Sequence, residues 1–141
     1  MKEQWKQVFN SHYFVSNLGR IKRFNNGELV EINPKLGTRN YLRVNIKGKE
    51  YKIHVLVATL FLKKPKGNNL VVDHLDRNKL NNRVDNLEWV TQSVNIKRHY
   101  ERMNTDKIMR EMMEQNLKSL TIIDEMTYNR FNELNKEFTK F

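Results

Sequence analysis

The chain has 141 residues, with 26 Lys and Arg against 16 Asp and Glu, a formal net charge of +10 and no cysteine. This length fits one modest domain, or a small domain with an appendage, and the lack of cysteine excludes disulfides, thiolate zinc sites and cysteine nucleophiles. The first residues lack the apolar stretch of a secretory signal, and no run reaches membrane-spanning length, so we expect a soluble, cytoplasmic protein.

The positive charge is concentrated before Thr105. Residues 1–104 carry +11, whereas residues 105–141 carry −1. Such a block attracts polyanions, because each neutralised phosphate releases condensed counterions. Solubility alone is an alternative explanation. RNA or an acidic membrane surface would also fit the charge, although no basic amphipathic helix supports a membrane role.

The first 53 residues predict a small antiparallel sheet. Residues 13–15, 20–23 and 29–32 are prone to form strands, and turns are expected at residues 16–19 and 25–27. Residues 41–46 alternate in polarity, and Gly48 then lies in a tight hairpin turn before residues 51–53 return. The outward face suits either DNA or plain solvent, and its basic residues favour DNA: Arg20, Lys22, Arg23, Arg39 and Arg43.

Residues 54–62 predict a helix that is too apolar for a surface position, so we place it beneath the sheet. His54 could be catalytic. At the start of a buried helix, however, we expect a structural histidine that is hydrogen-bonded to backbone or phosphate. The basic residues 63–69 contain Pro and Gly and predict a loop.

Residues 70–95 predict a strand, a loop, a second strand and a helix. The apolar residues 70–72 end at Asp73-His74, an asparagine-rich segment follows, and residues 87–90 form the second strand. Thr91 is a suitable N-cap for a helix from residue 92 to about 102. Asn95 and His99 then share one face of this helix, because they are four residues apart.

Other residues of this unit have structural explanations. We expect Trp89 in the core rather than as a platform for base stacking. Asn81 and Asn82 are expected to hydrogen-bond the loop backbone, because asparagine readily supports turn geometry.

Residues 70–95 resemble the signature of the HNH endonucleases, also called ββα-metal nucleases. The likeness is to the homing enzymes of phages and introns, and it is carried by Val72-Asp73-His74-Leu75-Asp76, Asn81-Asn82, Asn86-Leu87-Glu88-Trp89-Val90 and Asn95. Trp5, residues 13–22 and the helix at 54–61 are similar to the sheet module and connecting segment that often precede that signature. Three blocks in the right order cover residues 5–100.

The resemblance implies a role for each signature residue. Asp73 would be a metal ligand, and His74 the general base, a task that suits an imidazole titrating near pH ~6.5. Asn86 would tie down the loop and orient the base, and Asn95 would complete the protein ligands of the metal. Oxygen ligands without thiolate favour one Mg²⁺ or Mn²⁺ per site. His99 is either a phosphate or metal contact or an ordinary exposed histidine.

Two further arginines are predicted to contact DNA. Arg77 stands where relatives commonly have glycine after Asp76, which changes the loop turn or adds a phosphate contact. Arg98 lies on the helix that carries Asn95.

The sequence therefore predicts an α+β protein: a β-rich DNA-contacting module (residues 1–53), an HNH ββα-metal nuclease core (54–104) and a helical tail (105–141). The implied activity is metal-dependent nicking of double-stranded DNA by a monomer, rather than a homodimer, with 5′-phosphate and 3′-hydroxyl products. If phage-encoded, the protein would act in the cytoplasm of a bacterial host. The alternatives are a non-catalytic DNA-binding protein that retains the HNH fold, and an RNA-binding module.

The tail predicts two helices. The first, capped by Thr105, would carry an apolar stripe at helical spacing, and the second would include Tyr128 and Leu134 with further aromatic residues. Family resemblance suggests a DNA-binding role for the tail, whereas its −1 charge equally favours packing on the body or on a second copy. The stripe comprises Ile108, Met109, Met112, Met113, Leu117 and Leu120.

Overall fold

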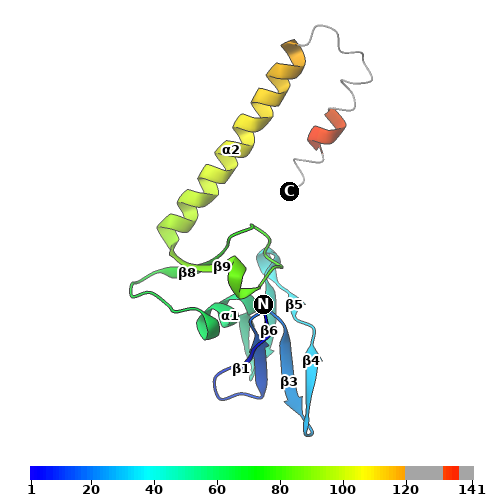
Figure 1. Cartoon of the computed structure of the whole chain (residues 1–141), viewed down its shortest axis with the longest axis vertical. Helices are drawn as coiled ribbons and strands as arrows, with labels where there is room; N and C mark the ends of the chain where they lie inside the picture. The colour runs from blue at the N-terminus through cyan, green and yellow to red at the C-terminus, as the bar shows by residue number, and fades with distance from the viewer. Residues whose placement is uncertain (120–131, 137–141) are drawn as a thin grey trace. The chain divides into compact units, whose positions relative to one another are not determined.

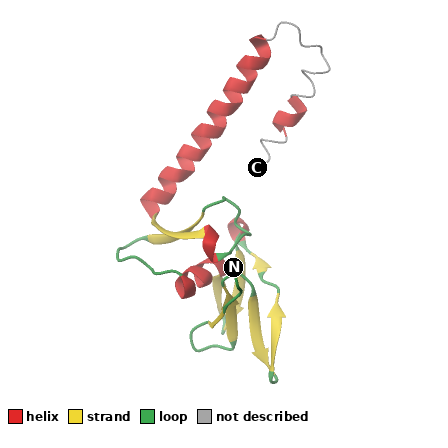
Figure 2. Ribbon diagram, viewed as in Figure 1, coloured by secondary structure: helices red, strands yellow, loops and turns green. Residues whose placement is uncertain are grey.

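The computed structural model describes residues 1–119 and 132–136 and has the predicted mixed α+β architecture (Figures 1 and 2). The chain divides into two compact units, Met1–Asn95 and Ile96–Phe141. Within the described ranges, no helix is both long and apolar enough to cross a membrane.

The first sheet is antiparallel, and its four strands are adjacent in chain order. It contains β1 (Trp5–Gln7), β2 (Tyr13–Ser16), β3 (Ile21–Asn25) and β4 (Glu28–Ile32). The turn predicted at residues 25–27 joins β3 to β4, with φ of 49° at Asn26 and 82° at Gly27. Two successive positive φ values form the type I′ turn that matches the strand twist, and Asn-Gly favours this turn.

The second sheet continues the antiparallel pattern and contains β5 (Lys35–Leu36), β6 (Leu42–Ile46) and β7 (Lys49–Lys52), with the short 3₁₀ turn η1 (Thr38–Asn40) before β6. The predicted alternation is confirmed, since Val44 and Ile46 are buried and Asn45 is exposed. The predicted hairpin turn is also confirmed: Gly48, with φ of 83°, lies between β6 and β7.

The last part of the first unit contains the two strands of the predicted ββα arrangement and the first residues of its helix. Helix α1 (Ile53–Phe61) leads to β8 (Leu70–His74), which pairs antiparallel with β9 (Leu87–Thr91), and η2 (Val84–Asn86) immediately precedes β9. Helix α2 (Gln92–Ser119) follows β9 directly. The Thr91 hydroxyl accepts a hydrogen bond from the Val94 amide at 3.3 Å, which confirms Thr91 as the N-cap.

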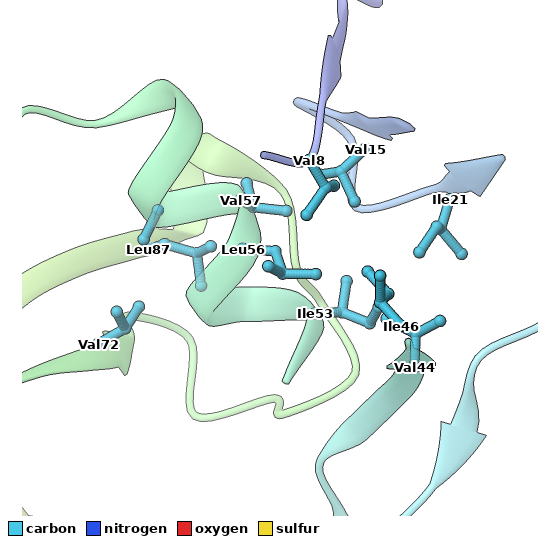
Figure 3. Packing of buried hydrophobic residues seen from close by; sticks show 11 residues of the cluster. Val8, Val15, Ile21, Val44, Ile46, Ile53, Leu56, Val57, Val72 and Leu87 are labelled. Carbon is cyan, nitrogen blue, oxygen red and sulfur yellow. The ribbon is translucent and has the colours of Figure 1, made fainter. Parts of the chain in front are cut away.

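One hydrophobic core serves the sheets and the ββα hairpin together. Figure 3 shows Ile53, Leu56 and Val57 of α1 between two groups of side chains. On one side lie Val72 and Leu87 from β8 and β9, and on the other lie residues of the first two sheets and of the loop between β1 and β2. Trp89 packs against the same core, as predicted, and its indole N–H donates to the Ala58 carbonyl at 3.3 Å. The residues from the sheets and loop are Val8, Val15, Ile21, Val44 and Ile46.

The predicted helix break near Thr105 is wrong, because α2 continues without interruption to Ser119. The Thr105 hydroxyl does not cap a new helix but donates to the Glu101 carbonyl one turn earlier at 2.9 Å. A mid-helix threonine can bond backward in this way. Residues 132–136 are helical and include Leu134. Tyr128 and the Leu120 end of the apolar stripe lie outside the described residues, as do the expected aromatic residues Phe131 and Phe138.

Candidate active site

Asp73 and His74 are the last two residues of β8 and are both buried, at 8% and 5% exposure. In the β8–β9 ladder, Asp73 lies opposite Glu88 and His74 opposite Leu87. Because successive side chains of a strand alternate, the carboxylate and the imidazole leave the hairpin on opposite faces.

The imidazole of His74 is held by Asn82, whose side chain is also buried. His74 Nε2 and Asn82 Oδ1 are 2.8 Å apart. With this oxygen as acceptor, Nε2 carries the proton and Nδ1 keeps its lone pair. Nδ1 is thus the basic nitrogen. The Asn82 side-chain oxygen therefore bonds the histidine, whereas a bond to the loop backbone was expected.

Asn86 holds the loop between β8 and β9 through a reciprocal pair with Asp76. The Asn86 side chain accepts from the Asp76 amide at 3.0 Å and donates to the Asp76 carboxylate at 2.9 Å and to the Asn81 carbonyl at 2.8 Å. The Asn81 side chain donates to the other carboxylate oxygen of Asp76 at 2.8 Å, not to the backbone as predicted. This bond and the amide of Asn78 lower the pKa of Asp76, so its carboxylate stays charged and keeps its donors.

Two aromatic rings flank His74. The His54 ring centroid is 4.7 Å from that of His74, and the Tyr41 ring stacks on His54 at 4.8 Å and lies 6.1 Å from His74. The ammonium groups of Lys52 and Lys79 lie over the Tyr41 ring, 4.9 and 4.7 Å from its centroid. Cations thus collect beside the histidine, where an approaching phosphate would be attracted.

His54 is buried and uncharged. Its Nδ1 has no hydrogen-bond partner among the described residues, so the predicted bond to backbone is not found at this atom. Burial, followed by the charges of His74 and Lys52, lowers the pKa of His54 from 6.5 to about 3.

This low pKa predicts acid sensitivity of the fold. Between pH 6.5 and about 3 the unfolded chain binds a proton at His54 that the folded protein does not. The free energy of unfolding should therefore decrease as the pH falls through this window, by up to about 1.4 kcal/mol per pH unit from this residue. Urea unfolding across the window should show a shallower dependence of the unfolding free energy on pH for His54→Gln than for wild type. Equal slopes for the two proteins would contradict this origin.

Arg77, expected to replace a glycine of similar proteins, has a backbone conformation that favours glycine. Its φ is 63°, in the left-handed region that favours glycine, and its amide donates to the His74 carbonyl at 3.1 Å. A residue with a side chain adopts this conformation at a cost in the free energy of folding.

Comparing Arg77→Gly with Arg77→Ala isolates this cost, because both variants lose the guanidinium. We expect the free energy of unfolding to be about 1 kcal/mol higher for the glycine variant than for the alanine variant. An equal or lower value for the glycine variant in chemical denaturation would refute this expectation.

The predicted metal ligands are Asp73 and Asn95. Asn95 is half-buried in the first turn of α2. Among the residues that the structure describes, no group of three or more His, Cys, Asp and Glu side chains is arranged to hold a metal. One carboxylate with an amide oxygen nevertheless fits Mg²⁺, which usually binds through one or two carboxylates and completes its shell with water and substrate phosphate oxygens.

The predicted DNA contacts lie in different local settings. Arg20 pairs with Glu31 and Glu3 at 2.8 and 2.9 Å, which raises the pKa of Arg20 and lowers that of Glu31. Arg43 pairs with Glu50 at 3.3 Å. The ammonium of Lys22 lies over the Trp5 ring and the Arg23 guanidinium over the Tyr13 ring, and Arg39 is exposed in η1. His99 is exposed and Arg98 half-buried on α2. These assignments stay predictions.

Sequence reasoning missed Asn82, Asp76 and Tyr41 as parts of the site. A doubled asparagine eight residues after a strand-end histidine is the available signal for Asn82. The distance between Tyr41 and His74 along the chain leaves no local pattern for the ring cluster.

Two family models match the chain. Residues 3–53 match the NUMOD4 motif, and residues 51–97 match the HNH endonuclease family. The two matches meet at the start of α1 and together cover the sheets and the ββα unit.

Individual relatives are similar over most of the chain. The DNA endonuclease I-HmuI of Bacillus phage SP01 is 35% identical over 129 residues, covering 85% of this chain and 72% of that enzyme. An uncharacterised HNH endonuclease of Acanthamoeba polyphaga mimivirus is 35% identical over 127 residues, which are 83% of this chain and 31% of that protein. A solved structure describing DNA binding and cleavage by the homing endonuclease I-HmuI aligns with a TM-score of 0.59 and 30% identity, over 76% of this chain and 66% of that one.

Proposed function

Because this chain belongs to the HNH endonuclease family, we propose that it is a metal-dependent DNA endonuclease that nicks one strand. The products would carry 5′-phosphate and 3′-hydroxyl ends. The phage enzyme among its relatives supports a phage or mobile-element origin, with activity in the cytoplasm of a bacterial host.

The observation that carries this proposal is the buried His74, whose Nε2 lies 2.8 Å from the side-chain oxygen of Asn82. Because that oxygen can only accept, Nε2 is the donor and Nδ1 is available to take a proton from water. A general base must have its basic atom oriented as well as a suitable charge state. Asn86 and Asp76 support this orientation indirectly, since they brace the loop that carries Asn82.

The proposed reaction is an in-line displacement at phosphorus. As water attacks, its proton moves to His74 Nδ1, the new P–O bond forms, and the bond from phosphorus to the 3′ oxygen breaks. The leaving 3′ oxygen takes a proton from a solvent water and becomes the 3′-hydroxyl, and His74 then releases its proton to solvent. A Mg²⁺ or Mn²⁺ held by Asp73 and Asn95 would supply positive charge at the scissile phosphate and the leaving oxygen.

The basic surface of residues 1–104 supports double-stranded DNA as the substrate. Lys52 and Lys79 lie next to the ring cluster of His74, and neither pairs with a carboxylate among the described residues, so both are proposed to attract the phosphate backbone. A single Asp73-His74 site per chain favours a monomer that cuts one strand at a time.

The direct test is incubation of supercoiled plasmid with the protein and Mg²⁺ or Mn²⁺. The proposal predicts open-circular DNA before linear DNA, no cutting in EDTA, and resealing of the nick by DNA ligase, which requires 5′-phosphate and 3′-hydroxyl ends. A plasmid that stays supercoiled with every metal would contradict the nuclease assignment. Nicks that ligase cannot reseal would contradict the proposed end chemistry.

The second candidate is a DNA-binding protein that kept the fold without catalysis. It is favoured by the basic surface alone, and it predicts plasmid retardation in a gel with no metal-dependent cleavage. The buried His74, held by Asn82 at 2.8 Å, favours the enzyme, because DNA binding does not require a buried imidazole that is held in one orientation.

A further inference from the structure

We propose that the turn Ser16–Gly19 of the first sheet is a positioning element for His74, acting through Asn82; this inference rests on the proposed role of His74 as base. Both segments belong to the unit Met1–Asn95. The turn lies within the NUMOD4 match and Asn82 within the HNH match, so the contact joins the two.

The closest approach is between the backbone of Gly19 and the backbone and Cβ of Asn82. Gly19 has φ of 83°, and a Cβ built on it would lie 2.9 Å from both the Cβ and the carbonyl oxygen of Asn82. Such distances are shorter than real Cβ contacts, and neither atom belongs to the end of a flexible side chain. A side chain at residue 19 would therefore displace Asn82, and the acceptor of the His74 Nε2–H would move with it.

A hydrogen bond next to this contact fixes the alignment of the turn with the loop between β8 and β9. The Val84 amide, two residues after Asn82, donates to the Asn17 carbonyl at 2.8 Å. The Asn17 side chain is buried; it accepts from the Gln4 amide at 2.9 Å and donates to the Lys2 carbonyl at 3.0 Å. The N-terminal segment thus fixes the position of the turn through Asn17, and the turn fixes the position of the loop between β8 and β9 through Val84.

The turn is itself rigid. The Ser16 hydroxyl is fully buried and accepts from the amides of Leu18 and Arg20 at 3.2 and 3.1 Å. The Gly19 amide donates to the Ser16 carbonyl at 3.0 Å. Because displacing one residue of this turn breaks several of these bonds, the turn moves as a unit, and a shift of the turn also shifts the residues packed against it.

Gly27 provides a matched control. Its φ is 82°, almost identical to that of Gly19, but nothing lies within 4 Å of a Cβ built there. Gly19→Ala and Gly27→Ala therefore impose the same backbone strain in the same sheet. Only the first variant collides with Asn82.

The test measures single-turnover nicking of supercoiled plasmid in Mg²⁺ and nitrogen NMR of the His74 ring at alkaline pH. Gly19→Ala should lower the maximal rate about tenfold or more, because small displacements of catalytic groups have effects of this size. The protein concentration for half-maximal rate should not change. The His74 ring should change from the Nε2–H tautomer to a mixture of both tautomers, and Gly27→Ala should match wild type in every readout.

A folded Gly19→Ala variant with wild-type rate and tautomer would overturn the proposal, as would a loss confined to DNA affinity. If Gly19→Ala does not fold, Asn17→Ala serves instead: it loosens the turn from the N-terminal segment and should give a smaller change in the same direction. An Asn17→Ala protein identical to wild type in rate and tautomer would also overturn it. A wild type that does not cut plasmid contradicts the proposed function alone, because the NMR comparison needs no activity.

Discussion

Replacement of His74 by alanine is expected to slow plasmid nicking about 10³-fold, within the range that a positioned general base contributes. The reason is local. His74 supplies a basic nitrogen whose orientation is fixed by a buried hydrogen bond from its ring to Asn82 at 2.8 Å. DNA affinity should not change, because the imidazole is buried and is not part of the basic surface. The measurement is the single-turnover rate beside a gel-shift titration.

His12→Ala is the control for this variant. His12 is exposed and its carbonyl, which the substitution retains, accepts the Phe24 amide. The control protein should cut at the wild-type rate. A His74→Ala protein that cuts equally fast would remove His74 from the chemistry, and a parallel loss of DNA affinity would instead assign it to binding.

Removal of the Asp73 carboxylate should have the second large effect. Asp73→Ala is expected to lower the rate by about 10³-fold at any metal concentration, which is the effect of removing one preorganised electrostatic group. Asp73→Asn keeps an oxygen but loses the charge. For this variant we expect the Mg²⁺ or Mn²⁺ concentration for half-maximal rate to increase on the order of 100-fold. Rates measured across a metal titration distinguish the two effects.

Asp85→Asn removes the same charge at the surface. The Asp85 carboxylate is about half exposed and pairs only with Arg83 among the described contacts. Its metal dependence should match that of wild type. An Asp73→Asn protein with an unchanged metal titration would show that Asp73 does not bind the ion.

The elements around the site were predictable because each has a local signal. Asn26-Gly27 and Gly48 mark the hairpin turns, polarity alternates along β6, and Thr91 caps α2. The helix through Thr105 was not predictable in this way. Threonine serves equally as an N-cap and as a mid-helix residue bonded to the preceding turn, and only the structure distinguishes the two.

Within the site, the sequence identified Asp73 and His74 but not how the histidine is held. Asn81 and Asn82 are identical neighbours, yet the side chain of one bonds Asp76 and that of the other bonds His74. The difference follows from long-range packing: Gly19 touches the backbone of Asn82, and these residues are far apart in the sequence. Single-sequence patterns carry local preferences and do not encode such a contact.

The most direct test of the account starts from a complex assembled without metal. Wild type, His74→Ala and Asp73→Ala are each saturated with supercoiled plasmid in EDTA, and the reaction is started with excess Mg²⁺. All three proteins should bind the plasmid equally, and only wild type should convert it to open circles. Equal binding with cleavage by all three, or by none, would contradict a nuclease centred on Asp73 and His74.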